Sequence, residues 1–150
     1  MNFHIKRKMQ QINSKEIIEE YINITIDGLD KSIIWVVYVL RSFADKDLMY
    51  VGCTNNIKRR LRQHNGMIKG GGEYTSENRP WRLALLVPVN NREDALNVEY
   101  WAKAKNWKDK STIPNDNPIN RRWYLIKESM KIYNYSKFIV FDQDFTEFVH

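Results

Sequence analysis

"DLMYVGCTNNIKRRLRQHNG", residues 47–66, joins an apolar segment to a strongly basic one. The short apolar and aromatic run at 48–52 is typical of a strand. The segment 56–64 places apolar residues at helical spacing and is followed by a glycine, so it predicts a basic helix capped by Thr54 or Asn55. We therefore expect a strand that leads almost directly into a helix, and the rest of the chain is interpreted around this pair.

Apolar segments on either side of this stretch predict two more strands. The β-branched and aromatic run "IIWVVYVL", 33–40, is typical of a buried strand, and the short polar segment after it favours an antiparallel hairpin with 48–52. "WRLALLVPV", 81–89, predicts a third strand, and a helix should start at Asn90 with Glu93 as its capping-box partner. The order strand, strand, helix, strand, helix indicates a compact α+β unit.

The two ends of the chain extend this unit, which we place at 33–105. Residues 1–32 form an N-terminal extension with a short helix behind a possible cap at Ser14. Residues 106–150 form a C-terminal extension with a helix at 120–131, and we expect it to pack on the domain.

The composition bounds the class of protein. A chain of 150 residues with 43% hydrophobic content suits one domain with a packed core. The net charge of +6 fits a polyanionic partner or a solvated basic surface equally well. The chain has no apolar run of about 18 residues and no apolar signal segment, so we expect an intracellular protein, not secreted and without a membrane span. The single cysteine, Cys53, excludes an internal disulfide and a structural zinc site.

Two predicted helices each turn an ionisable group toward the core. Ile57, Arg60, Leu61 and His64 share one helix face, and the two apolar residues must be buried, so Arg60 and His64 lie at the edge of the buried face. On the later helix, Glu99 lies beside the apolar side. A shielded charge needs a partner of opposite sign. The groups form either an Arg60–Glu99 ion pair that holds the helices together or part of a catalytic pocket.

Two tyrosines could belong to the same pocket. Tyr38 and Tyr50 lie in the first two strands, at positions that can be neighbours across an antiparallel hairpin. They are either core residues or part of a reaction site. In the second case Arg60 and a metal-bound carboxylate would make the phenol of Tyr38 lose its proton more easily, because nearby positive charge favours phenolate.

Four features together resemble the GIY-YIG nuclease family. They are "VVY" at 36–38, "YVG" at 50–52, Arg60 followed by His64, and Glu99 on a later helix. Val36 and Val37 stand where the family usually has glycine and isoleucine, whereas the tyrosine is retained. Within the family the chain is most similar to the nuclease domain of Slx-type structure-specific endonucleases. The resemblance implies a small three-stranded antiparallel sheet flanked by helices.

The resemblance also implies a role for each site residue. Glu99 would be the single carboxylate on one divalent ion, Mg²⁺ or Mn²⁺. Arg60 would bind the scissile phosphate. Tyr38 would activate or position the attacking water, with Tyr50 lining the same pocket. His64 would assist the proton transfer or bind phosphate.

Further cations on the outer faces of the predicted elements could contact the DNA backbone. These are Lys58, Arg59, Arg62, Lys69, Arg79 and Arg82. The loop "KGGGEYT", 69–75, could let a nucleic-acid strand approach closely, and "NRRWY", 120–124, could stack on an unpaired base.

The sequence therefore predicts a metal-dependent DNA endonuclease acting on branched or flap DNA in repair, recombination or replication. One alternative is a sequence-preferring homing or restriction-like nuclease, and another is a non-catalytic DNA-binding module. Slx-type proteins commonly carry a zinc-binding module that docks a scaffold partner. One cysteine cannot build that module, so we expect a protein that acts alone or as a homodimer, with a viral source as one possibility.

Overall fold

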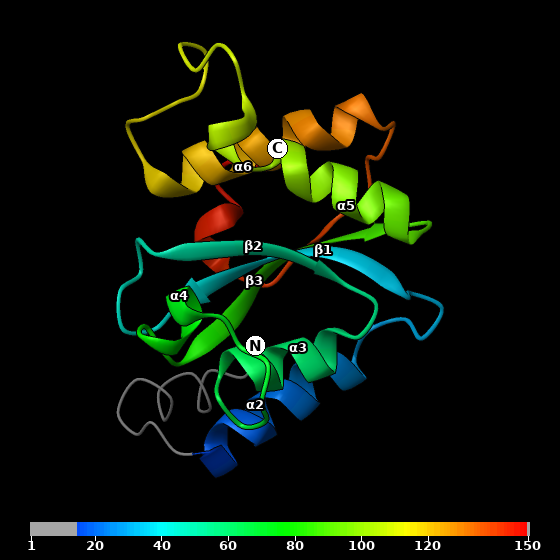
Figure 1. Ribbon diagram of the computed structural model, residues 1–150, viewed down its shortest axis with the longest axis vertical. Coiled ribbons are helices and arrows are strands. Elements are labelled where there is room, and N and C mark those ends of the chain that lie inside the picture. The colour runs from blue at the N-terminus through cyan, green and yellow to red at the C-terminus, as the bar shows by residue number, and fades with distance from the viewer. Residues whose placement is uncertain (1–14, 150) are drawn as a thin grey trace.

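A four-stranded antiparallel sheet forms the centre of the protein in the computed structural model, which describes residues 15–149 (Figure 1). The strand order is β2-β1-β3-β4, with β1 (Trp35–Ser42), β2 (Met49–Thr54), β3 (Trp81–Val89) and β4 (Ile139–Val140). The three long strands confirm the expected small antiparallel sheet of an α+β fold, and the two-residue β4 is added to it beside β3. The expected cap at Ser14 lies outside the described residues.

The first two strands form the predicted hairpin, in a register that pairs Tyr38 with Gly52 and Leu40 with Tyr50. β1 is an inner strand of the sheet and helices pack on both of its faces, which explains its continuous apolar run. β1 extends two residues beyond its predicted end because Arg41 and Ser42 are polar but buried. Their burial depends on partners that are distant in sequence, which a local pattern cannot show.

Helices cover both faces of the sheet (Figure 1). α5 (Arg92–Trp101) and α6 (Pro118–Ile132) pack on one face, whereas α2 (Lys15–Asp27) and α3 (Ile57–His64) pack on the other. Side chains alternate along β1, so Val37 faces the first pair of helices and Tyr38 the second. None of the helices within 15–149 is both long enough and apolar enough to cross a membrane.

Both predicted helix caps are displaced by one or two residues. α3 is capped by Asn56, whose side-chain oxygen accepts a hydrogen bond from the Arg59 backbone N–H at 3.1 Å, and not by Thr54 or Asn55. α5 is capped by Asn91, which accepts from the Asp94 N–H at 2.8 Å. Because several consecutive residues can cap a helix, composition alone does not select among them.

Shorter helical elements are also present, and the first of them lies in the segment predicted as a loop. They are α4 (Glu73–Ser76), η1 (Ala104–Asn106) and η2 (Gln143–Phe145). α4 lies beside the site described below, and η2 follows Asp142, which forms ion pairs with two arginines of the sheet, Arg41 and Arg82. These pairs connect the C-terminal segment to β1 and β3.

Candidate active site

The phenol of Tyr38 reaches the edge of the sheet by passing over Gly52. Tyr38 is on β1, and a Cβ atom at position 52 of β2 would collide with its hydroxyl and ring. Glycine is therefore the residue that allows this close approach. The ring centroids of Tyr38 and Tyr50 are 6.3 Å apart, so the two tyrosines are neighbours across the hairpin.

Tyr38 is the first member of a hydrogen-bonded chain. Its hydroxyl lies 2.8 Å from Nε2 of His64, and Nδ1 of His64 lies 3.0 Å from the Thr75 hydroxyl. An Arg60 nitrogen also lies 3.3 Å from Nε2. A guanidinium can only donate, so Nε2 is the unprotonated nitrogen and Nδ1 carries the hydrogen. It follows that the phenol donates to His64, that His64 donates to Thr75, and that Thr75 donates to the Gly72 carbonyl at 3.2 Å.

The electrostatics favour a neutral pair. Burial, together with the charges of Arg60 and Arg79, lowers the pKa of His64 to about 4, so the imidazole is uncharged at neutral pH. Burial also raises the pKa of Tyr38, and this effect outweighs the lowering by Arg60. Arg60 thus favours loss of the Tyr38 proton, as expected, but burial outweighs this effect, so the phenol stays protonated at neutral pH in the protein without metal. The phenol instead has a neutral proton acceptor, His64, within hydrogen-bond distance.

Arg60 is held by neutral groups. Its guanidinium donates to the Gln63 side-chain oxygen at 2.5 Å and to the Gly70 carbonyl at 3.0 Å, in addition to His64. Among the described residues it has no carboxylate partner, and Glu99 pairs instead with Lys103 at 3.0 Å. The alternative of a structural Arg60–Glu99 ion pair is therefore wrong. The guanidinium keeps its full positive charge and is already oriented.

Arg60 and Glu99 approach the site from opposite faces of the sheet, not across one shared interior as we expected. α3 carries Arg60 on the face that contains Tyr38, whereas Glu99 of α5 interacts with Cys53 of β2. Gly52 and Cys53 are consecutive residues of the edge strand β2, so the two groups lie on either side of that strand. The charges of both Arg60 and Glu99 act on the Tyr38 phenol. Burial, followed by Glu99, raises the pKa of the Cys53 thiol to about 12, which suits a packing residue.

Glu99 is suited to hold a hard cation. Its side chain is 20% exposed, and Lys103 occupies only one of its carboxylate oxygens. Within residues 15–149 no group of three or more His, Cys, Asp or Glu side chains could enclose a metal. Mg²⁺ often binds through one or two carboxylates and completes its coordination with water and substrate phosphates. A lone carboxylate at the sheet edge fits that kind of site.

Residues 34–113 match the model of the GIY-YIG catalytic domain. The chain belongs to this family. The match covers more than half of the 150 residues and confirms both the resemblance and the expected enzyme class, a GIY-YIG endonuclease domain.

The chain is also similar to proteins named structure-specific endonuclease subunit SLX1. It is 48% identical to the one from Podospora anserina over 56 residues, which are 36% of this chain and 16% of that protein. It is 50% identical to the one from Aspergillus terreus over 68 residues, which are 43% of this chain and 17% of that protein. It is 32% identical to the one from Malassezia globosa over 108 residues, which are 67% of this chain and 24% of that protein. The chain thus spans less than a quarter of the length of these curated relatives, and their fungal origin lends no support to a viral source.

Two of the cations expected to contact DNA are instead paired within the GIY-YIG protein. Arg62 forms a bidentate pair with Glu19 of α2, with its Nε 3.0 Å from both carboxylate oxygens. Arg82 is 6% exposed and pairs with Asp142. The prediction that Arg82 contacts DNA is therefore wrong, because its guanidinium is buried against a carboxylate, whereas a DNA contact by the partly exposed Arg62 stays a prediction.

The other four predicted cations remain available to an anion. Arg59 and Lys69 are exposed, and Lys58 lies 3.6 Å from the exposed carboxylate of Asp27. Arg79 donates from Nε to the His64 carbonyl at 2.8 Å, so its guanidinium lies beside α3. They remain candidates for contact with the phosphate backbone of DNA.

Thr75 is a site residue that sequence reasoning missed. It lies in α4 within the segment predicted as a loop, is fully buried, and contacts His64 across eleven residues of sequence. The neighbouring Tyr74 has its ring 6.2 Å from that of Tyr50 and is 46% exposed. No local pattern marks a threonine as the partner of a distant histidine, so only the fold brings them together.

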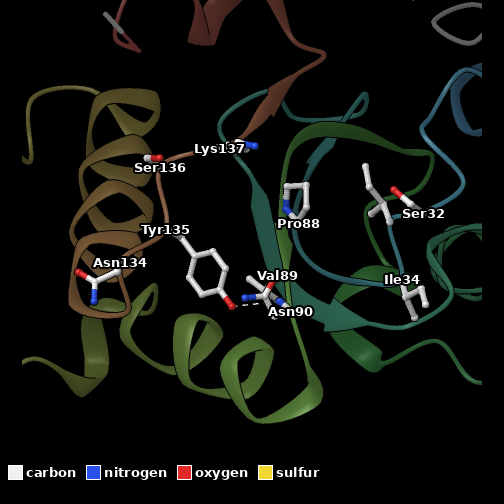
Figure 2. A pocket seen from close by; sticks show the side chains of 10 residues that line it. Ser32, Ile34, Pro88, Val89, Asn90, Asn134, Tyr135, Ser136 and Lys137 are labelled. Atoms are coloured by element: carbon white, nitrogen blue, oxygen red, sulfur yellow. Dashed lines mark hydrogen bonds between the residues drawn. The ribbon is translucent and has the colours of Figure 1, made fainter.

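A cavity of about 580 Å³ lies at the start of β1 and the end of β3, and contains none of the predicted site residues. Figure 2 shows that Tyr135 projects into it and contacts the Asn90 backbone. Lys137 is the only charged residue of its lining, and no carboxylate, histidine or cysteine lines it. This cavity is therefore separate from the Tyr38–His64–Thr75 cluster.

Proposed function

We propose that this protein is a divalent-metal-dependent DNA endonuclease that hydrolyses phosphodiester bonds in branched or flap DNA. The observation that carries the proposal is the cluster at the β2 edge. There the unpaired guanidinium of Arg60 lies beside a phenol that is hydrogen-bonded to a neutral histidine.

Arg60 has the properties needed to bind the scissile phosphate. A planar guanidinium can give two parallel hydrogen bonds to phosphate oxygens, which become more negative in the transition state. Gln63, Gly70 and His64 hold the group in place without neutralising it. The interaction with phosphate therefore gains from a charge that is oriented before the substrate arrives.

Tyr38 and His64 have the properties needed to remove a proton from the attacking water. As the phenol gives its hydrogen to Nε2 of His64, its oxygen can take a proton from the water, and the charge of the new imidazolium is balanced by the phosphate. Thr75 holds the histidine in the required tautomer. A Mg²⁺ or Mn²⁺ ion held by Glu99 would supply positive charge for the phosphoryl and leaving oxygens.

The relatives' names support a substrate defined by structure. Each relative reported above is named a structure-specific endonuclease subunit. The word subunit also supports a partner protein, whether a different chain or a second copy of this one. We propose that residues 33–105 form the catalytic unit, that Lys58, Arg59, Lys69 and Arg79 contact the DNA backbone, and that the protein acts inside the cell, where that DNA is found.

One experiment tests the proposal. The protein is incubated with Mg²⁺ and labelled flap, fork, junction and linear duplex DNAs, beside Glu99→Gln and a control on the same helix, Glu93→Gln. We expect nicking of branched DNA by wild type and by the control. Glu99→Gln should not cut but should still bind DNA, because it removes the metal ligand and leaves the cations.

Other outcomes would favour the alternatives. Equal cutting of linear duplex at one sequence would support a restriction-like nuclease. Binding without cutting in any metal would support a non-catalytic module, which is disfavoured by the intact Tyr38–His64–Thr75 chain. Full activity in Glu99→Gln would refute the proposed metal ligand.

A further inference from the structure

Most of the net positive charge of the chain lies in one segment. Residues 103–127 contain seven Lys or Arg residues and two Asp residues, a net charge of +5 out of +6 for the whole chain. This segment covers η1, the connector after it and the first part of α6. Such a concentration favours a polyanionic partner, although a basic surface can also face only solvent.

Aromatic rings run through the same region. Ring centroids are 5.0 Å apart for Tyr100 and Trp101, 6.3 Å for Trp101 and Trp107, and 6.2 Å for Trp107 and Tyr124. Tyr100 is 49% exposed, and the other three are partly exposed. The Trp107 indole N–H donates to the Trp101 carbonyl at 2.7 Å, which fixes the orientation of that ring.

The structure changes which residues of 120–124 could stack on a base. Trp123 is 5% exposed and belongs to the core, so it is not accessible to a nucleotide. Tyr124 lies instead beside Trp107, with the Lys127 ammonium 6.0 Å from its ring centroid. Aromatic faces next to cations are the combination with which proteins bind unpaired bases and their phosphates.

Two arginines of this region have only backbone carbonyls as partners. Arg122 donates to the Ala102 carbonyl at 3.0 Å and Arg121 to the Pro114 carbonyl at 3.2 Å. Neither forms an ion pair with a carboxylate of residues 15–149, in contrast to Arg62 and Arg82. The charge of Arg121 therefore remains available to an anion, whereas burial lowers the pKa of the Arg122 guanidinium.

The region adjoins the catalytic edge. Tyr100 directly follows Glu99, and Lys103 pairs with the Glu99 carboxylate. A strand with a phosphate near Glu99 would therefore lie next to the start of this region.

We propose that Tyr100, Trp107, Tyr124, Lys105, Lys108 and Lys127, which we name the α5–α6 surface, bind a single-stranded arm of the DNA substrate. Bases stack on the rings and phosphates contact the lysines. The proposal rests on the proposed nuclease function. An acidic protein segment is the competing occupant, but exposed aromatic rings beside the lysines favour a nucleic-acid strand.

The test compares two DNAs in EDTA, where no cutting occurs. One is a duplex with a 12-nucleotide single-stranded arm, and the other is the same duplex with blunt ends. Binding is measured by fluorescence anisotropy. Tyr100→Ala should weaken binding of the armed DNA by about five- to 150-fold, the effect of one lost stacking contact. Tyr100→Phe should restore it, and blunt duplex should change by less than about twofold.

The exposed lysines give a second variant that leaves the partly buried rings intact. Lys105→Gln/Lys108→Gln should reduce the salt dependence of arm binding by about 1.4 logarithmic units per tenfold change in salt, since each single-strand phosphate contact contributes about 0.7. The control is Lys31→Gln/Lys46→Gln, two exposed lysines outside this surface, which should bind as wild type does.

The outcomes separate this inference from the proposed function. If wild type cuts branched DNA but the Tyr100 and lysine variants bind the arm normally, only the α5–α6 surface is refuted. If wild type neither binds nor cuts any of the DNAs, the proposed function fails. Tyr100-dependent binding of a polyglutamate peptide without any effect on arm binding would also overturn the inference, in favour of a protein partner.

Discussion

Arg41 and Arg82, which are opposite each other on β1 and β3, differ from Arg60 of α3 in their partners. Arg41 and Arg82 share the buried carboxylate of Asp142, and a guanidinium nitrogen of Arg41 lies 2.9 Å from its Oδ2 atom. Arg60 is held by an amide, a carbonyl and an imidazole. A guanidinium paired with a carboxylate is neutralised and serves the fold. One held by neutral acceptors is oriented but keeps its charge, so it can receive a phosphate.

The largest effect should come from removing the unpaired arginine. Arg60→Ala should lower kcat on branched DNA by about 10³- to 10⁵-fold, the range for an arginine that stabilises a phosphoryl transition state. Arg60→Lys should recover only part of this loss, because an ammonium lacks the planar pair of donors. Single-turnover cleavage measures both. A loss below about tenfold in Arg60→Ala would mean that Arg60 does not contact the reacting phosphate.

Breaking the ion pairs of Asp142 with Arg41 and Arg82 should reduce the stability of the fold more than the rate of cleavage. Asp142→Asn leaves the buried Arg82 without a carboxylate and Arg41 with only the exposed Asp144, so it should lower the free energy of unfolding by about 3–5 kcal/mol. Asp144→Asn is the matched control, because its carboxylate also contacts Arg41 but is 60% exposed, and it should cost less than about 1 kcal/mol. Urea denaturation gives both values. Equal costs would show that burial of Asp142 is unimportant.

The same carboxylate predicts a pH dependence of stability. Burial would raise the pKa of Asp142, but Arg82 and Arg41 outweigh it and hold the pKa below its usual value. The contribution of the Asp142 carboxylate to the free energy of unfolding is therefore complete above its unfolded pKa of about 3.9. It is lost as the pH falls toward the lower pKa of the folded state. The stability of Asp142→Asn should not show this decrease at low pH.

Thr75 should matter for turnover more than for binding. Thr75→Val removes the acceptor that fixes the His64 tautomer, so kcat should fall by about ten- to 100-fold with KM unchanged, and Thr75→Ser should restore it.

The pH profile of kcat/KM tests the role of His64. Because His64 must be neutral to accept a proton and its pKa is about 4, activity should be retained down to about pH 4 and decline below it. An acid limb near 6.5 would contradict the role of His64.

The smallest effect should come from the exposed pair of Arg62 and Glu19, whose side chains are 33% and 31% exposed. Glu19→Gln should change stability by less than about 1 kcal/mol and leave cleavage unaffected. Thermal unfolding and cleavage rates check this. A large loss of activity would show that α2 positions α3 through this pair.

The local patterns predicted the parts of the fold that depend on neighbours in sequence. The strand at 81–89 agrees with β3 in both of its ends, and the basic helix agrees with α3 within one residue. The same patterns misplaced both caps and missed α4, because adjacent polar residues are nearly equivalent until tertiary contacts select one. They also assigned Arg62 and Arg82 to the outer surface, since nothing local identifies their partners Glu19 and Asp142.

The sequence by itself determined the α+β class, the hairpin and the family, because the spacing of apolar residues and the Tyr38, Tyr50, Arg60, His64 and Glu99 pattern are local or ordered along the chain. Only the tertiary structure decided which arginines pair with carboxylates, which nitrogen of His64 carries hydrogen, and that Arg60 and Glu99 lie on helices on opposite faces of the sheet. The physical reason is that the state of a charged group depends on the few atoms around it, and here those atoms come from residues far away in the sequence.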